Sequence, residues 1–284
     1  MRPYAMTALR YLTRRFYHIE NAFFLPHMAS NMDNDLHGSD SKKDKRIAVL
    51  FPGSYRSVDS LYDEIKERFP NGIANRLAMQ TLERLLSCPW ETLEVAFETC
   101  LGDNGIEMSD ELIADFLNHA KILDHFIRMY YRCRVLSVIA QAEIPLTILS
   151  EGWSGFPPAQ SANVRVLPAV GYARVFQYME EAEIVLNVMP WFKAGSHERI
   201  FNALLYDACP LSDKSTWLTN HFEENQEYAF YSLEQLERLP VQVYSLLNQE
   251  DLRRTIIQNG KKKVINNYTS RQNAQRIVNF LEQI

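Results

Sequence analysis

This 284-residue sequence lacks long apolar runs, clustered cysteines and any excess of basic residues. No uninterrupted apolar stretch approaches the roughly 18 residues that predict a membrane-spanning helix. The four cysteines are scattered, without Cys-x-x-Cys spacing or histidine partners, so we expect reduced thiols in a cytoplasmic protein rather than a disulfide framework or a zinc site. The formal net charge of -5 argues against broad binding of nucleic acid or anionic lipid, because both require a dominant basic face. Composition therefore predicts an ordinary globular protein.

The N-terminus is basic, with Arg2, Arg10, Arg14 and Arg15 and no acidic residue before Glu20. This pattern suits a mitochondrial transit peptide, and it equally suits an ordinary amphipathic helix. A secretory signal is not indicated, because no long apolar stretch follows the arginines.

The remaining chain alternates short apolar runs with helical patterns. Residues 30–46 are almost free of apolar side chains and predict a linker. Strands separated by helices require a parallel sheet. We therefore predict a doubly wound, mostly parallel, Rossmann-like α/β sheet. The expected strands are 47–51, 144–149, 164–170, 184–188, 209–212 and 228–231.

A helical insertion is expected after the first strand, over residues 73–143. Pro89 suits the first position of one helix, with Gly102 just past its end. A second, long helix is expected from Ser109 to Ala142, because its apolar residues recur at spacings of three and four.

In such a sheet, ligands bind outside the carboxyl ends of the strands, where the strand order reverses. The exit loop at 189–196, "MPWFKAGS", is longer than a strand-to-helix turn requires. It leads into a helix expected at 197–206, with Ser196 as the N-cap. The helix N-terminus, together with Lys193, His197 and Arg199, would stabilise an anion such as a diphosphate, although Glu198 opposes this. The alternative is that Ser196 only caps, Arg199 pairs with an acid and His197 is a surface residue.

The stretches "IVLNVMPWFKAGSHERIFNALLYDACPLSD", "WLTNHFEENQEYAFYSLEQLERLP" and "IIQNGKKKVINNYTSRQNAQRI" resemble the C-terminal half of the CgeB-type (spore maturation protein-like) glycosyltransferases, which have the two-domain GT-B architecture. The same pattern is visible earlier as "FFLPHMAS", "IAVLFPGSYR" and "IPLTILSEGW". The resemblance covers nearly the whole chain and is most specific over 144–284.

The resemblance implies a domain that binds a nucleotide-diphosphate sugar as donor substrate, with no metal and no separate cofactor. In its terms Arg199 and His197 would act in catalysis, with Arg199 stabilising the charge that develops on the leaving diphosphate. Trp153 would either cover the base or fill the core. The candidate donor-binding residues are Gly53, Ser54, Tyr55, Arg56, Gly152, Trp153, Lys193, Gly195, Ser196 and Asn202.

The sequence also departs from this family pattern. Ala194 and Asn202 stand where related enzymes often carry two glutamates, and Asp207 replaces a glycine after the helix. Asp tolerates a left-handed turn, so we expect the fold to survive. By this resemblance, we expect only the last part of an acceptor-binding N-terminal domain in this sequence. We therefore expect residues 1–45 to be a remnant of that domain plus the linker, packing back onto a donor domain at 46–284.

Two functions remain open at this point. One is glycosyl transfer from a nucleotide sugar to an unknown acceptor, with the missing domain supplied by a longer chain or a partner chain. The other is a noncatalytic interaction or regulatory module that kept the GT-B-like fold. We do not expect nucleic-acid binding through the lysines at 261–263, which predict a solvated helix face.

Overall fold

A computed structural model describes residues 15–16, 18–19, 23–30, 45–190 and 193–283. Both readings of the basic N-terminus concern residues that lie mostly outside this described part, as does most of the predicted linker. The tip of the long exit loop, residues 191–192, also lies outside it.

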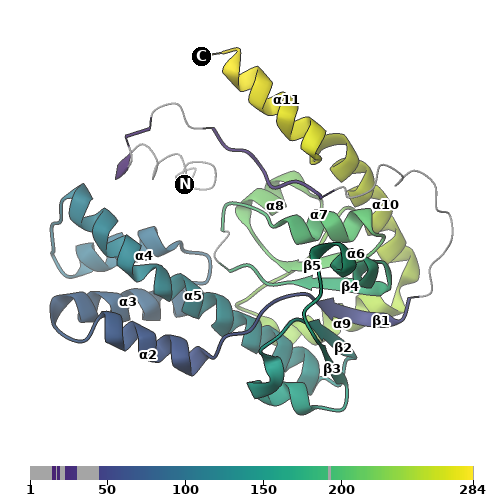
Figure 1. Cartoon of the computed structure of the whole chain (residues 1–284), viewed down its shortest axis with the longest axis horizontal. Coiled ribbons are helices and arrows are strands. Elements are labelled where there is room, and N and C mark those ends of the chain that lie inside the picture. Colours follow the sequence, from purple (N-terminus) through teal and green to yellow (C-terminus); the bar gives the residue numbers. More distant parts are fainter. Residues whose placement is uncertain (1–14, 17, 20–22, 31–44, 191–192, 284) are drawn as a thin grey trace.

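The core of the protein is a six-stranded sheet in which every strand pairing is parallel (Figure 1). Its order, β3-β2-β1-β4-β5-β6, confirms the predicted doubly wound fold. Each predicted strand exists, with ends shifted by a few residues. The strands are β1 (Ile47–Phe51), β2 (Leu146–Leu149), β3 (Val164–Leu167), β4 (Ala182–Asn187), β5 (Cys209–Asp213) and β6 (Ala229–Tyr231).

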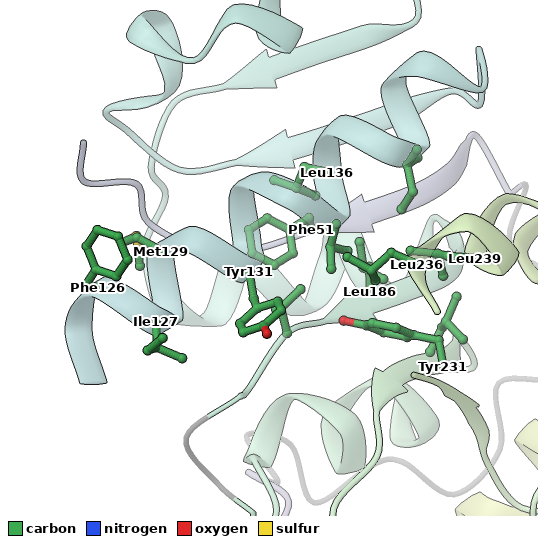
Figure 2. Packing of buried hydrophobic residues seen from close by; sticks show 14 of the residues in the cluster. Phe51, Phe126, Ile127, Met129, Tyr131, Leu136, Leu186, Tyr231, Leu236 and Leu239 are labelled. Carbon is green, nitrogen blue, oxygen red and sulfur yellow. The ribbon is translucent and has the colours of Figure 1, made fainter. Parts of the chain in front are cut away.

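Helices cover both faces of this sheet, which is why its central strands are apolar without alternation. Phe51 of β1 faces one layer, beside Leu136, Leu186 and Tyr231 (Figure 2). The neighbouring Leu50 faces the opposite layer. One layer contains α9 (Leu239–Asn248) and part of α5. The other contains α6 (Tyr172–Glu180), α7 (Glu198–Leu205) and α10 (Glu250–Asn267), and α8 (Thr216–His221) and α11 (Ser270–Leu281) complete the C-terminal region.

The insertion is a bundle that begins earlier than predicted, at Val58 rather than near 73. Its helices are α2 (Val58–Arg68), α3 (Gly72–Ser87), α4 (Leu93–Asp103) and α5 (Asp110–Gln141). The predicted start at Ser109 is confirmed, since its side chain caps α5 by accepting from the Leu112 amide. The predicted start at Pro89 is wrong. Thr92 caps α4 instead, because its hydroxyl accepts a hydrogen bond from the Val95 amide.

The 32 residues of α5 span roughly 48 Å at 1.5 Å per residue. Its C-terminal half packs on the sheet through Val135, Leu136 and Ile139. Its N-terminal half continues beyond the sheet into the bundle (Figure 1). The helix therefore extends past the carboxyl ends of the strands, where ligands bind in this fold.

The described segment 23–30 packs on the C-terminal part of the chain. The Ala29 amide donates to the Tyr268 carbonyl at 2.8 Å, and the Asn273 side chain donates to the Pro26 carbonyl at 2.8 Å. Residues 23–30 therefore lie against the C-terminal part of the chain, while most of the predicted N-terminal helix lies outside the described residues.

The turn after α7 is left-handed, as the sequence predicted. Asp207 has φ 55 and forms an ion pair with Lys261 at 2.8 Å. Lys263 pairs in turn with Glu227 at 2.6 Å. Two of the three lysines at 261–263 are therefore held by acids of the same chain.

Candidate functional site

A cavity of about 230 Å³ lies at the reversal of strand order, between β1 and β4. Its walls combine the loops that leave β1, β2 and β3 with one side of α6 and the start of α7. Four predicted site residues line it together, namely Gly53, His197, Arg199 and Asn202. These four residues therefore share one cavity at the strand ends, and their role in binding stays a prediction.

Gly53 allows the chain to turn closely over the end of β1. A Cβ atom at this position would lie only 2.7 Å from the Phe51 ring. The Gly53 carbonyl accepts a hydrogen bond from the Trp153 indole at 2.7 Å, which fixes the turn. The cavity floor thus depends on a residue without a side chain.

The helix α7 begins at Glu198, and its N-cap is His197 rather than Ser196. The His197 Nδ1 accepts a hydrogen bond from the Arg199 amide at 3.1 Å, so the imidazole takes the place predicted for a hydroxyl. Ser196 is buried, and within the described part of the chain its hydroxyl has no hydrogen-bond partner. The prediction of Ser196 as the cap is wrong.

Arg199 is buried and points over the carboxyl edge of the sheet. Its Nη1 donates to the Asn187 side-chain oxygen at 2.8 Å, and its guanidinium lies 5.6 Å from the centre of the Phe51 ring. Burial lowers the pKa of Arg199 to about 10, so the group stays charged at neutral pH. The predicted alternative was that Arg199 pairs with an acid, whereas its hydrogen-bond partner here is the Asn187 amide.

Asn187, which sequence reasoning missed, holds Arg199 in this direction. It is fully buried at the end of β4, where its amide nitrogen donates to the Ser212 hydroxyl at 2.9 Å. Its backbone carbonyl accepts from the Tyr231 hydroxyl at 2.8 Å. The available signal was a lone amide at the end of an otherwise apolar strand.

His197 is neutral in the folded protein. Burial, followed by the charges of Arg199 and His27, lowers the pKa of His197 to about 2. Its Nδ1 lies 3.2 Å from the Glu198 carboxylate, but a neutral ring makes this contact no ion pair. The sequence had suggested a positive charge here. The structure corrects that to a neutral ring that can only donate a hydrogen bond through Nε2.

The segment 27–30 lies against the opening of the cavity. The Ser30 amide donates to the Asn202 side-chain oxygen at 2.7 Å, and the Ser30 hydroxyl is 2.8 Å from that of Tyr172. His27 lies 3.6 Å from the Glu198 carboxylate. Asn202 was predicted to hydrogen-bond a hydroxyl of the sugar donor. In the structure, its side-chain oxygen accepts a hydrogen bond from a backbone amide of this chain.

Residues 132–279 match the family described as glycosyl transferase-like. The chain belongs to this family. The narrower resemblance to CgeB-type enzymes stays a prediction. A search of curated proteins gives no match.

Solved structures with a similar fold include Anabaena Alr3699/HepE in complex with UDP-glucose, at 13% identity and a TM-score of 0.44, over 53% of this chain and 45% of that chain. A variant of S. aureus TarM in complex with Fondaparinux, alpha-GlcNAc-glycerol and UDP is 12% identical, with a TM-score of 0.44, over 54% of this chain and 32% of that chain. This chain therefore spans less than half the length of either protein.

Several predicted donor-binding residues do not line the cavity. Trp153 is fully buried against Phe51 and Tyr55, so of its two predicted roles the structure shows the core-filling one. The Tyr55 ring packs on Trp153, with the ring centres 4.9 Å apart, so this side chain also contributes to packing. Gly152 has φ 88, and a Cβ there would lie 3.1 Å from the Tyr55 carbonyl, so its role is a close turn. Ser54 is exposed, and its carbonyl accepts from Arg132 at 3.0 Å.

The other predicted basic residues also point elsewhere. Arg56 forms an ion pair with Glu64 of α2. Lys193 donates to the Pro89 carbonyl of the insertion, and burial lowers the pKa of Lys193 to about 8. The Gly195 carbonyl accepts from the Ser215 hydroxyl at 2.6 Å. The contacts of Lys193 and Gly195 attach the exit loop to the bundle and to the start of α8. They also satisfy polar groups that a long loop would otherwise leave without hydrogen-bond partners.

No group of three or more His, Cys, Asp or Glu side chains that could hold a metal ion occurs within the described ranges. Of the helices described, none combines the length and apolar character that crossing a membrane requires. Arg199 and the start of α7 bring positive charge to the cavity.

Proposed function

We propose that this chain binds a nucleotide-diphosphate sugar at the cavity between β1 and β4 and takes part in transferring its glycosyl group to an acceptor. The observation that supports this most is the meeting of Gly53, Arg199 and the start of α7 around one cavity at the strand-order reversal. Membership of a glycosyl transferase-like family supports glycosyl transfer as the reaction class.

The diphosphate would lie at the start of α7, against the positive end of the helix and the Arg199 guanidinium. Negative charge grows on the leaving phosphate as the glycosyl bond breaks. A fixed cation stabilises this charge by typically a few kcal/mol, without a metal ion. His197 would add a hydrogen bond from its Nε2, since its other ring nitrogen is bound to the Arg199 amide.

The cavity would enclose only part of a nucleotide sugar, because its volume of about 230 Å³ lies below the range typical for a drug-sized ligand, about 300–1,000 Å³. The Asn202 side-chain oxygen already accepts a hydrogen bond from the Ser30 amide, and its amide NH2 group can still donate to a ligand hydroxyl. A bound donor would therefore lie beside the segment 27–30.

Thermal unfolding with UDP, GDP and their sugars tests the proposal. A ligand at 100 times its Kd stabilises the native state by about 2.7 kcal/mol, which corresponds to a rise in Tm of roughly 5 °C for a chain of this size. Replacing Arg199 with Met should weaken the binding of UDP or GDP at least tenfold. Arg165→Met, on the exposed edge strand β3, is the matched control. If no nucleotide raises the Tm at millimolar concentration, the proposal fails.

A second function, a noncatalytic module, is supported by Ala194 and Asn202 at the positions of the two family glutamates and by the self-contact of Asn202 with Ser30. Turnover assays with sugar donors separate the two. Nucleotide binding without transfer or donor hydrolysis, in the presence of candidate acceptors, would favour the module.

A further inference from the structure

Asp124, near the middle of α5, carries a carboxylate that the fold does not use. The side chain is half-buried, and it forms no hydrogen bond and no ion pair with any described residue. Polar groups that are withdrawn from bulk water normally have a hydrogen-bond partner within the protein. An acid in this position is therefore a candidate for contact with a bound molecule.

Asp124 lies where the bundle meets the exit loop. Burial raises the pKa of Asp124 to about 7, the charge of Glu94 on α4 acts in the same direction, and the charge of Lys193 opposes both. Lys193 donates to the Pro89 carbonyl of the bundle. The charge of Asp213, at the end of β5, also acts on Lys193. The exit loop thus brings one lysine near both the bundle acid and the carboxyl edge of the sheet.

The helix α5 carries Asp124 outward from the cavity, because its N-terminal half continues beyond the strand ends (Figure 1). Arg132 of this helix donates at 3.0 Å to the carbonyl of Ser54, the neighbour of the cavity residue Gly53. Asp124 precedes Arg132 by eight residues, or about 12 Å along the helix. Since the cavity encloses only part of a nucleotide sugar, a sugar joined to a diphosphate at the start of α7 must extend outward. The space between the exit loop and the bundle is where an acceptor would meet it.

The other acids and the histidine of this region are poorly placed to remove a proton. Asp213 is 2% exposed, and its Oδ1 accepts a hydrogen bond from a backbone amide at 2.7 Å. His197 has a pKa of about 2, lowered first by burial, and its Nδ1 already accepts from a backbone amide. The Glu198 carboxylate lies 3.6 Å from His27. Asp124 has no such contact, and its pKa lies near neutral pH, where a general base is most effective.

We propose that Asp124 is the catalytic base that takes the proton of an acceptor hydroxyl in the space between the bundle and the exit loop. The hydroxyl oxygen gives an electron pair to the anomeric carbon of the donor sugar and loses its proton to the Asp124 carboxylate. The bond from that carbon to the diphosphate oxygen breaks, and its electron pair leaves with the nucleoside diphosphate beside Arg199. Asp124 then returns the proton to solvent.

The inference deepens the proposed function and rests on it for the donor. It assigns the acceptor side of the reaction to the helical insertion. The family match starts at residue 132, so Asp124 and the bundle before it lie outside the matched region. The acceptor is a hydroxyl compound without negative charge near the reacting group, because Asp124 and Glu94 would repel an anion there.

Release of UDP from UDP-glucose and of GDP from GDP-glucose tests the inference, with methyl glucoside and water as acceptors. Asp124→Asn is the test variant. Asp115→Asn is the control, because it makes the same change at an exposed position of the same helix. We expect Asp124→Asn to lower kcat at least about 100-fold and to leave the Kd of the nucleoside diphosphate unchanged. The control should change neither. The Tm of Asp124→Asn should not fall, because the carboxylate has no hydrogen bond to lose, whereas a structural role would lower it.

The pH profile gives a readout that a structural role would not move. A base acts when it is deprotonated, so kcat of the wild type should rise through about pH 7 and level off above it. Asp124→Asn should remove this rise. Lys193→Met removes a charge that lowers the pKa of Asp124, so the rise should move to higher pH. Glu94→Gln removes a charge that raises this pKa, so the rise should move to lower pH.

The outcomes separate this inference from the proposed function. Equal kcat values and pH profiles for wild type and Asp124→Asn overturn the inference and leave the proposed function standing. A wild-type chain that binds UDP or GDP but releases neither from its glucose conjugate also overturns the inference, and it favours the noncatalytic module. If neither nucleotide binds the wild-type chain, both the inference and the proposed function are wrong.

Discussion

Replacing Asn187 with Ala should destabilise the protein strongly, although no surface group is touched. The Asn187 side chain is fully buried, and its oxygen accepts a hydrogen bond from the Arg199 guanidinium at 2.8 Å. It also donates to the Ser212 hydroxyl at 2.9 Å. Alanine would leave a buried cation without this acceptor and a buried hydroxyl without this donor.

The magnitude follows from these two contacts. A hydrogen bond to a charged group contributes about 1.5–3 kcal/mol, and a neutral one contributes about 1 kcal/mol. The free energy of unfolding should therefore fall by about 2.5–4 kcal/mol, equivalent to a Tm loss of roughly 5–8 °C at about 2 °C per kcal/mol. Urea denaturation at pH 7 measures this, with an unchanged slope expected because the surface exposed on unfolding stays the same.

A double-mutant cycle that combines Asn187→Ala with Arg199→Met measures the interaction energy between the Asn187 and Arg199 side chains. When Arg199 is already methionine, removing Asn187 should cost at least about 1.5 kcal/mol less, because the buried cation is gone. Additivity within about 0.5 kcal/mol would show that the Asn187 side chain does not stabilise the Arg199 guanidinium, and the account of how the site is held would be refuted.

Two further predictions concern packing and pH. Gly260→Ala should lower the free energy of unfolding by about 1–3 kcal/mol, because the new Cβ would lie 2.5 Å from the Glu227 carbonyl oxygen. Gly102→Ala is the control: its new Cβ meets open space, so it should raise the free energy of unfolding by up to about 1 kcal/mol. Equal effects of the two changes in chemical denaturation would contradict this. Burial lowers the pKa of His197 in the folded protein to about 2, below its ordinary value of 6.5. Its contribution to stability is therefore complete above pH 6.5 and is lost as the pH falls below that value. The free energy of unfolding should fall by at most about 1.4 kcal/mol per pH unit from this group. His197→Asn keeps an N-cap oxygen and should flatten the loss of stability between pH 6 and 4, and identical pH profiles for variant and wild type would disprove the buried neutral ring.

The order of strands and helices could be predicted from local patterns. Six apolar runs with helical spacing between them require a parallel sheet, and the stripe that follows Ser109 requires one long helix. These features depend on residues a few positions apart, so periodicity is enough to find them. The cavity beside Gly53 followed from the general rule that ligands bind where strand order reverses.

The direction of each side chain at the site was decided by tertiary packing. Arg199 turns inward because Asn187 and Phe51 receive it, and Trp153 fills the core because the Gly53 carbonyl accepts its indole. Arg132 reaches Ser54 across 78 positions of sequence. Periodicity places a residue on a face of its own helix, but what that face meets depends on how distant segments pack. Arg132 of α5 and Arg199 of α7 therefore come near the same Phe51 ring only in the folded chain.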